Sequence, residues 1–210
     1  MPIESIITFV IASVLLGIAP GPDNIFVMAQ SALYGKKSGV LVTLGLCTGL
    51  IVHTSAVALG VAVIFQTSVL AFTVLKVVGA MYLLYLAWQA VRASASRLET
   101  PKSTLRSNGA LYRRGIIMNI TNPKVSIFFL AFLPQFASPE YGALAPQIAL
   151  LGGIFMIVSL VVFSAIAVLA GELGGWLNSS PKAQVYLNRI TGVVFAGLAL
   201  KLITASAATE

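Results

Sequence analysis

The chain has 210 residues, of which 58% are hydrophobic and only 9% are charged. Because an ordinary soluble domain carries about a quarter charged residues, this composition excludes a soluble globular protein. A membrane helix needs roughly 20 apolar residues, so about five or six crossings fit into this length. The single Cys47 and the single His53 exclude an internal disulfide and a metal framework built from these residue types. No cofactor is expected.

Six apolar runs follow one another along the chain, each bounded by charges or by glycine, proline and serine. The runs are continuously apolar over about 20 residues instead of alternating in segments of about ten, which favours helices over the strands of a membrane barrel. The sequence therefore predicts an all-α integral membrane protein with six transmembrane helices. The expected spans are residues 5–34, 40–65, 69–91, 115–137, 146–171 and 187–206.

Basic residues between the runs predict the orientation, because Lys and Arg in short loops stay on the cytoplasmic side. The loops at 66–68 and 138–145 carry neither residue. Both termini are therefore expected outside. The basic residues expected inside are Lys36, Lys37, Arg92, Arg97, Lys102, Arg106, Arg113, Arg114, Lys182 and Arg189.

One long hydrophilic stretch, residues 92–114, divides this single transmembrane domain of residues 1–210 into a first repeat, 1–91, and a second repeat, 115–210. We interpret the stretch as a cytoplasmic linker that fixes the topology and contacts anionic lipid. Nucleic-acid binding would need stacking aromatic residues among the basic ones, and Tyr112 is the only aromatic residue there. No nucleic-acid partner is expected.

Two of the predicted spans are interrupted by proline. In the first span the break is Pro20-Gly21-Pro22-Asp23, and in the fourth it is Asn122-Pro123-Lys124. Proline removes a backbone donor and clashes with the preceding turn, so each helix must break, and Asn122 before Pro123 is typical of an N-cap. Each break lies in the first span of a three-span half. Since three is odd, the halves must be inverted, and interrupted helices at matching positions of inverted repeats indicate the binding site.

A charged residue lies in each break. Interpolation between flanking charges puts Asp23, the only aspartate, and Lys124 each roughly 0.6 of the way across the membrane. A charge at this depth is costly and is typical of a transport path or proton relay, although a simple ion pair between the two halves is the alternative. The helix N-termini after Pro22 and Pro123 suit a carboxylate, and Asp23 suits an ammonium group. Together these groups suit a zwitterion.

Four stretches of the sequence are informative together: Ala19-Pro20-Gly21-Pro22-Asp23-Asn24, Gly35-Lys36-Lys37-Ser38-Gly39, Thr121-Asn122-Pro123-Lys124 and the apolar run 128–136. They resemble motifs of the LysE/RhtB amino-acid exporters, and the resemblance covers nearly the whole chain. It implies secondary export of amino acids or close derivatives across the bacterial inner membrane, driven by the proton gradient or by exchange. The Pro-Gly-Pro-Asp sequence is more similar to the neutral, threonine/homoserine-type branch than to the lysine branch.

The expected partners are an amino-acid substrate, protons and the lipid bilayer. His53, in the second span, is a candidate proton relay together with Asp23, and a histidine hydrogen-bonded across helices is the alternative. Gln30 lies on the same helix face as Asp23 and would extend the polar lining. The expected substrate-binding residues are Pro20, Gly21, Pro22, Asp23, Asn24, Asn122, Pro123 and Lys124.

Other classes fit the sequence less well. An intramembrane aspartyl protease needs two aspartates and a zinc protease needs paired histidines, so an enzyme is not expected. A metal-ion exporter would need clustered Cys, His or carboxylate ligands, and it remains the alternative together with an exporter of other small metabolites. The Gly45–Gly49 spacing permits close helix approach, either within the chain or in a homodimer.

Overall fold

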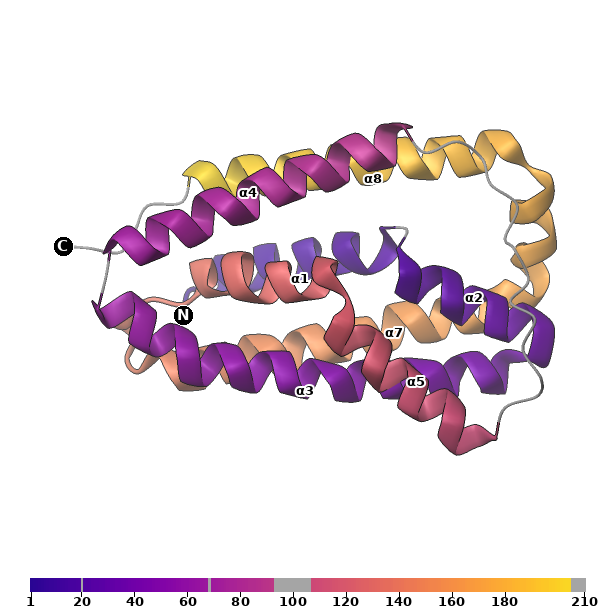
Figure 1. The fold of residues 1–210 in the computed structure, drawn as a ribbon, viewed down its shortest axis with the longest axis horizontal. Helices are drawn as coiled ribbons and strands as arrows, with labels where there is room; N and C mark the ends of the chain where they lie inside the picture. Colours follow the sequence, from indigo (N-terminus) through magenta and orange to yellow (C-terminus); the bar gives the residue numbers. More distant parts are fainter. Residues whose placement is uncertain (20, 68, 93–106, 205–210) are drawn as a thin grey trace.

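The computed structural model describes residues 1–19, 21–67, 69–92 and 107–204, and all regular elements in these ranges are helical, which confirms the predicted all-α class (Figure 1). The elements are α1 (Ile3–Ile18), α2 (Pro22–Tyr34), α3 (Lys36–Thr67), α4 (Val69–Arg92), α5 (Asn108–Thr121), α6 (Pro123–Ile127), η1 (Phe128–Phe132), η2 (Leu133–Phe136), η3 (Pro139–Tyr141), α7 (Leu144–Ser179) and α8 (Pro181–Thr204).

Three helices in the described ranges are each long and apolar enough to cross a membrane, namely α3, α4 and α7. Two bent pairs meet the same criterion when each is taken as one span. The first is α1 with α2, and the second is α5 with the helical segment Pro123–Phe136, which are bent by 50°. Five of the expected spans are thus accounted for by length and composition. The described part of α8 is not among them, so the sixth span stays a prediction.

The helices extend beyond their predicted bounds at several ends. α3 begins at Lys36 rather than at 40, and α8 begins at Pro181 rather than at 187. α5 begins at Asn108 rather than at 115, because Ser107 acts as its N-cap and accepts a hydrogen bond from the backbone N–H of Ala110 at 3.4 Å. Its first turns therefore lie in the stretch that was expected to be linker, whose residues 93–106 lie outside the described part of the chain. α7 continues to Ser179, beyond the expected end at 171.

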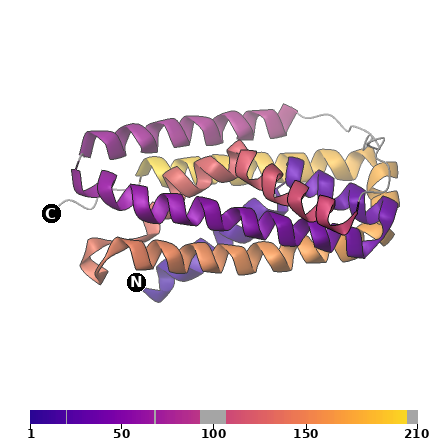
Figure 2. The ribbon, with the colours of Figure 1, turned by 60° about the horizontal axis from the view of Figure 1, so that its bottom comes forward.

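The broken helix of each half packs on the long helix of the other half (Figures 1 and 2). α5 packs along α3 and α1 packs along α7, while α2 packs against both α7 and the α3 helix of its own half. The central helices α3 and α7 also contact each other, and α4 pairs with α8 at one side of the bundle. The two breaks are therefore brought together between the halves.

Phenylalanines fill the core beside the breaks. Phe9 of α1 and Phe128, Phe129 and Phe132 of η1 are all fully buried. The rings of Phe128 and Phe132 lie 4.9 Å apart, and Phe128 also contacts Phe155 of α7 at 5.2 Å. Aromatic pairs in such arrangements contribute about 0.5–1.5 kcal/mol each beyond their buried area. This cluster fixes the second break against α1 and α7.

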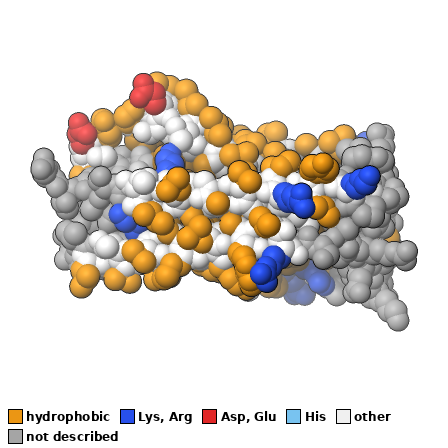
Figure 3. Space-filling model, turned by 90° about the horizontal axis from the view of Figure 1, so that it is seen from above, with side chains coloured by type: hydrophobic (Ala, Val, Ile, Leu, Met, Phe, Trp, Pro, Cys, Tyr) orange, Lys and Arg blue, Asp and Glu red, His pale blue; other side chains and the backbone are white. Residues whose placement is uncertain are grey.

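The outer surface is apolar over most of the length of the bundle. Large hydrophobic side chains such as Ile51, Met81, Ile157 and Val193 are exposed on four different helices, as expected for a surface in contact with lipid. Figure 3 shows hydrophobic side chains across the middle of one face, with most of the visible Lys and Arg side chains toward one end. The visible acidic side chains lie at the opposite end.

Candidate functional site

The first break lies between α1 and α2. α2 begins with Pro22 in its first turn, and Gly21 is the N-cap in an extended conformation, which confirms the predicted helix start. Asn24 Nδ2 donates a hydrogen bond over 2.6 Å to the carbonyl oxygen of Gly17, near the end of α1. Asn24 thus satisfies a carbonyl group that the break leaves without a helical partner. Pro20 lies outside the described residues.

The second break is centred on Asn122, which ends α5 and caps α6. Its Oδ1 accepts a hydrogen bond from the backbone N–H of Lys124 at 3.0 Å, and Pro123 occupies the first turn of α6. The hydroxyl group of Ser126 donates to the carbonyl oxygen of Asn122 at 3.1 Å. The predicted N-cap is therefore confirmed.

Lys124 connects the two breaks. Its side chain is buried, and Nζ donates hydrogen bonds to the carbonyl oxygens of Leu16 at 3.2 Å and Ala19 at 3.0 Å. These carbonyl groups form the negative end of the α1 dipole, which a cation stabilises. A Cβ atom at Gly21 would lie 3.1 Å from Nζ, so glycine leaves room for the ammonium group.

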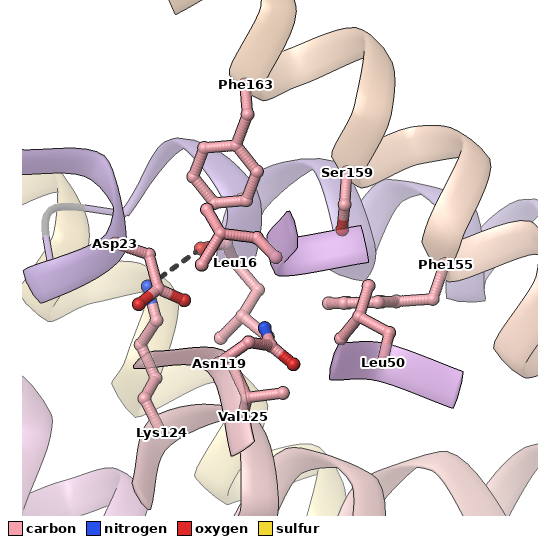
Figure 4. Close-up of a pocket in the computed structure, with 11 residues that line it drawn as sticks. Leu16, Asp23, Leu50, Asn119, Lys124, Val125, Phe155, Ser159 and Phe163 are labelled. Atoms are coloured by element: carbon pink, nitrogen blue, oxygen red, sulfur yellow. Dashed lines mark hydrogen bonds between the residues drawn. The ribbon is translucent and has the colours of Figure 1, made fainter. Parts of the chain in front are cut away.

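Asp23 lies at the centre of the site and is 2% exposed. Its Oδ1 has no hydrogen-bond partner among the described residues. Lys124 and Asn119 line the same cavity as Asp23 and lie beside it (Figure 4). A buried polar group without a partner is rare in proteins and costs free energy. The position is therefore suited to a ligand that donates hydrogen bonds.

A cavity adjoins these residues (Figure 4). Its volume is about 10 Å³, which is enough for roughly one water molecule. An amino acid does not fit unless the surrounding helices separate. The cavity is lined by Leu16, Gly17, Asp23, Leu46, Leu50, Asn119, Lys124, Val125, Phe155, Ser159 and Phe163.

Two polar lining residues, Asn119 and Ser159, were not among the residues predicted from the sequence. Asn119 is 2% exposed, and its Oδ1 has no hydrogen-bond partner in the described part of the chain. It is the only strongly polar residue of the run 115–120. A lone asparagine in an apolar segment, three residues before the break, could have indicated a site residue. Ser159 carries no such signal, because serine is common in apolar helices; only the packing of α7 identifies it.

His53 adopts the alternative arrangement that the sequence left open. Its Nε2 donates a hydrogen bond over 3.1 Å to the backbone oxygen of Asn119, near the end of α5. The imidazole ring also contacts the ring of Phe129, with centroids 5.6 Å apart. His53 thus holds the end of α5. It does not line the cavity itself but binds Asn119, which does. Gln30 is buried in α2 but does not line the cavity.

Comparison with known proteins identifies the family. The family model described as "LysE type translocator" matches residues 14–206. The chain belongs to the LysE family. This membership confirms the resemblance found in the sequence.

Relatives match over almost their whole length. The homoserine/homoserine lactone efflux protein of Salmonella typhimurium is 37% identical over 196 residues, which cover 93% of this chain and 94% of that protein. An uncharacterized membrane protein of Vibrio cholerae is 31% identical over 207 residues, covering 99% of this chain and 100% of the relative. An uncharacterized membrane protein of Bacillus subtilis is 28% identical over 207 residues, which cover 94% of this chain and 98% of that protein. No solved structure matches the chain.

Members of the LysE family are transporters, so the expectation that the chain is not an enzyme is confirmed. Together with the apolar helices, the family also supports a multi-pass membrane protein that handles a small-molecule substrate. The buried groups at the two breaks therefore belong to a translocator.

Proposed function

We propose that this LysE-family protein exports short neutral amino acids, or close derivatives of them, from the bacterial cytoplasm across the inner membrane. The observation that carries the proposal is the buried carboxyl group of Asp23, whose Oδ1 has no hydrogen-bond partner in the described residues, beside a cavity between two broken helices. The name of the Salmonella relative, a homoserine/homoserine lactone efflux protein, supports the same class of cargo.

In this proposal the two charged groups of an amino acid bind to different parts of the site. The ammonium group binds at Asp23. The carboxylate binds near the N-termini of α2 and α6, where backbone N–H groups and the positive ends of the helix dipoles favour an anion. Lys124 donates two hydrogen bonds to carbonyl oxygens of α1. A lysine ammonium group has three donors, so one N–H of Lys124 is left for the cargo.

The remaining residues at the breaks give the site its shape. Asn24 and Asn122 hold the ends of the interrupted helices, and Pro22 and Pro123 stop those helices from continuing through the site. Gly21 leaves space beside Lys124. Pro20, which lies next to Gly21 in the sequence, is included because it is part of the first break.

Alternating access follows from the packing of the two halves. With a cavity of about 10 Å³, the halves are closed around the two breaks. We propose that residues 1–91 and 115–210 are inverted repeats of three spans each, that both termini lie outside, and that one half rocks against the other around the breaks. The pairing of each broken helix with the long helix of the opposite half supports this symmetry.

Proton coupling would complete the cycle. After the amino acid leaves on the outside, a proton neutralises Asp23, and the empty site returns without a buried charge. Such a step lowers the cost of moving an unpaired carboxylate through the membrane interior. His53 is the candidate for delivering that proton because it binds the backbone of Asn119, which lines the cavity together with Asp23.

Counterflow in proteoliposomes tests the proposal. Vesicles with purified protein are loaded with one unlabelled amino acid, and uptake of the same labelled compound is followed. We expect saturable counterflow with short neutral amino acids and none with acidic or aromatic ones. Protein-free vesicles provide the background. Absence of counterflow with every neutral amino acid, in protein shown to be folded and inserted, would contradict the proposed function.

A further inference from the structure

The nitrogen and the oxygen of the Asn119 carboxamide face different parts of the site. In Figure 4 its nitrogen is turned toward Asp23, while its oxygen is turned away from Asp23, toward the side where Leu50 and Phe155 lie. The oxygen is buried and has no hydrogen-bond partner among the described residues. A buried acceptor in this state leaves its full desolvation cost uncompensated. The Asn119 oxygen can therefore accept a hydrogen bond at the side of the cavity that lies away from Asp23.

Two neighbours keep the carboxamide in this position. His53 binds the backbone oxygen of Asn119 at 3.1 Å. On the opposite helix, Gly49 allows the close approach, since a Cβ atom there would lie 2.8 Å from both Cβ and Oδ1 of Asn119. The side chain is thus confined against α3, so its oxygen is presented in a fixed direction.

The surroundings of this oxygen are apolar except for one hydroxyl group. Leu46, Leu50, Phe155 and Phe163 form the walls, and Ser159 points from α7 toward the cavity (Figure 4). Ser159 is itself 3% exposed. A binding site with apolar walls and a few placed polar groups recognises a ligand by where its own polar groups fall.

We propose that Asn119 Oδ1 and the Ser159 hydroxyl group form a recognition site for the side-chain hydroxyl group of the cargo. This inference rests on the proposed function, because it takes the ammonium group of the amino acid to be bound at Asp23. The amide nitrogen of Asn119 faces Asp23 while its oxygen accepts from the cargo, so a single planar group separates the two subsites. The cargo side chain is therefore short and carries a terminal hydroxyl group.

The physical basis for selectivity is the cost of an unpaired acceptor. A site built to hydrogen-bond a substrate hydroxyl group rejects an analogue that lacks it, because the buried polar groups of the site then stay unpaired. Homoserine and norvaline are a suitable pair, since they differ by a terminal hydroxyl group in place of a methyl group. We expect wild-type protein to prefer homoserine over norvaline by about tenfold or more in counterflow.

The decisive variant is Asn119→Leu, which removes the acceptor at similar volume. We expect the preference for homoserine to fall by about tenfold, through a higher KM for homoserine and an unchanged or lower KM for norvaline. Ser159→Ala should also lower the preference for homoserine over norvaline, but by a smaller factor. Gln30→Leu is the matched control: it removes a buried amide outside the cavity and should leave the ratio unchanged.

The outcomes separate this inference from the proposed function. No counterflow by wild-type protein with either compound overturns the inference, and no counterflow with any neutral amino acid overturns the proposed function as well. Counterflow by wild-type protein with the same ratio in Asn119→Leu overturns the inference alone. An equal loss for both compounds also overturns it, because a purely structural role of Asn119 predicts that result. If Asn119→Leu does not fold, as judged by gel filtration, the ratio in Ser159→Ala and in Asn119→Ala decides in the same way.

Discussion

The ammonium group of Lys124 donates a hydrogen bond over 3.0 Å to the carbonyl oxygen of Ala19, 105 residues away in the sequence. This bond joins the second break to the end of the helix that forms the first break. Lys124 follows Pro123 in the second break as Asp23 follows Pro22 in the first. The two halves therefore place a cation and an anion at matching positions of their interrupted helices.

Replacing Lys124 by methionine should destabilise the protein strongly. The change leaves the carbonyl groups of Leu16 and Ala19 without a donor and removes the cation beside Asp23. A buried acceptor left without its donor costs about 1–3 kcal/mol, and here two carbonyl groups lose theirs. We expect a lower Tm for the purified protein in detergent. Lys37→Met, at an exposed position, is the control and should leave Tm nearly unchanged.

The double variant Lys124→Met/Asp23→Asn sharpens this test. If the loss in Lys124→Met comes partly from the uncompensated carboxylate, removing the charge of Asp23 should recover part of the Tm. Purely additive losses in the double variant would mean that Asp23 and Lys124 do not interact.

Asp23→Asn should separate exchange from net transport. The asparagine cannot lose or gain a charge, so a cycle that needs protonation of residue 23 stops, while a loaded site could still exchange one amino acid for another. We expect net efflux driven by a proton gradient to fall to background and counterflow to persist at a reduced rate. Glu4→Gln, an exposed acidic residue near the N-terminus, should change neither activity. Unchanged net efflux in Asp23→Asn would remove this residue from the coupling step.

Gly49→Ala should disturb the site through Asn119. A Cβ atom at position 49 would lie 2.8 Å from two side-chain atoms of Asn119, and overpacking of this kind costs about 1–3 kcal/mol. We expect a lower Tm and a weaker preference for hydroxylated cargo. Gly60→Ala in the same helix is the control, because a Cβ atom there meets nothing within 4 Å. Equal effects of the two substitutions would show that the contact with Asn119 is unimportant.

Asn122→Ala should weaken the start of α6. Loss of an N-cap side chain costs about 0.5–2 kcal/mol, and here it also releases the backbone N–H of Lys124. We expect a reduced Tm together with reduced counterflow, and we expect Asn122→Ser to restore part of both. Ser107→Ala removes a comparable cap at the exposed start of α5, so a loss of transport in that variant as well would argue against a specific role for Asn122.

The positions of the breaks could be predicted from the sequence because they follow from local backbone chemistry. Pro22 and Pro123 begin new helices wherever they occur in a helical run, and Asn122 caps by bonding to a residue two positions away. The partner of Lys124 could not be predicted in this way. Its hydrogen bonds to α1 depend on how the halves pack, and the sequence suggested only that it lay at the same depth as Asp23.

The roles of Asn119 and Ser159 could not be predicted from the sequence either, because they too depend on packing. Each is a polar residue within an apolar stretch of its helix. It becomes part of a site only because α5 and α7 turn it toward one cavity. The bond between His53 and the backbone of Asn119 is equally non-local. The predicted start of α5, at residue 115, is too late for a different reason. The first turns of this helix are polar, and the apolar pattern that indicates a span begins only after them.

The most direct test of the central claim is equilibrium binding of labelled homoserine to the purified protein, measured for the wild type and for Asp23→Leu. Gel filtration first establishes that both proteins are folded. The account predicts saturable binding to the wild type, displaced by excess unlabelled homoserine, and no saturable binding to Asp23→Leu. Equal binding to both proteins would contradict a cargo site at the broken helices.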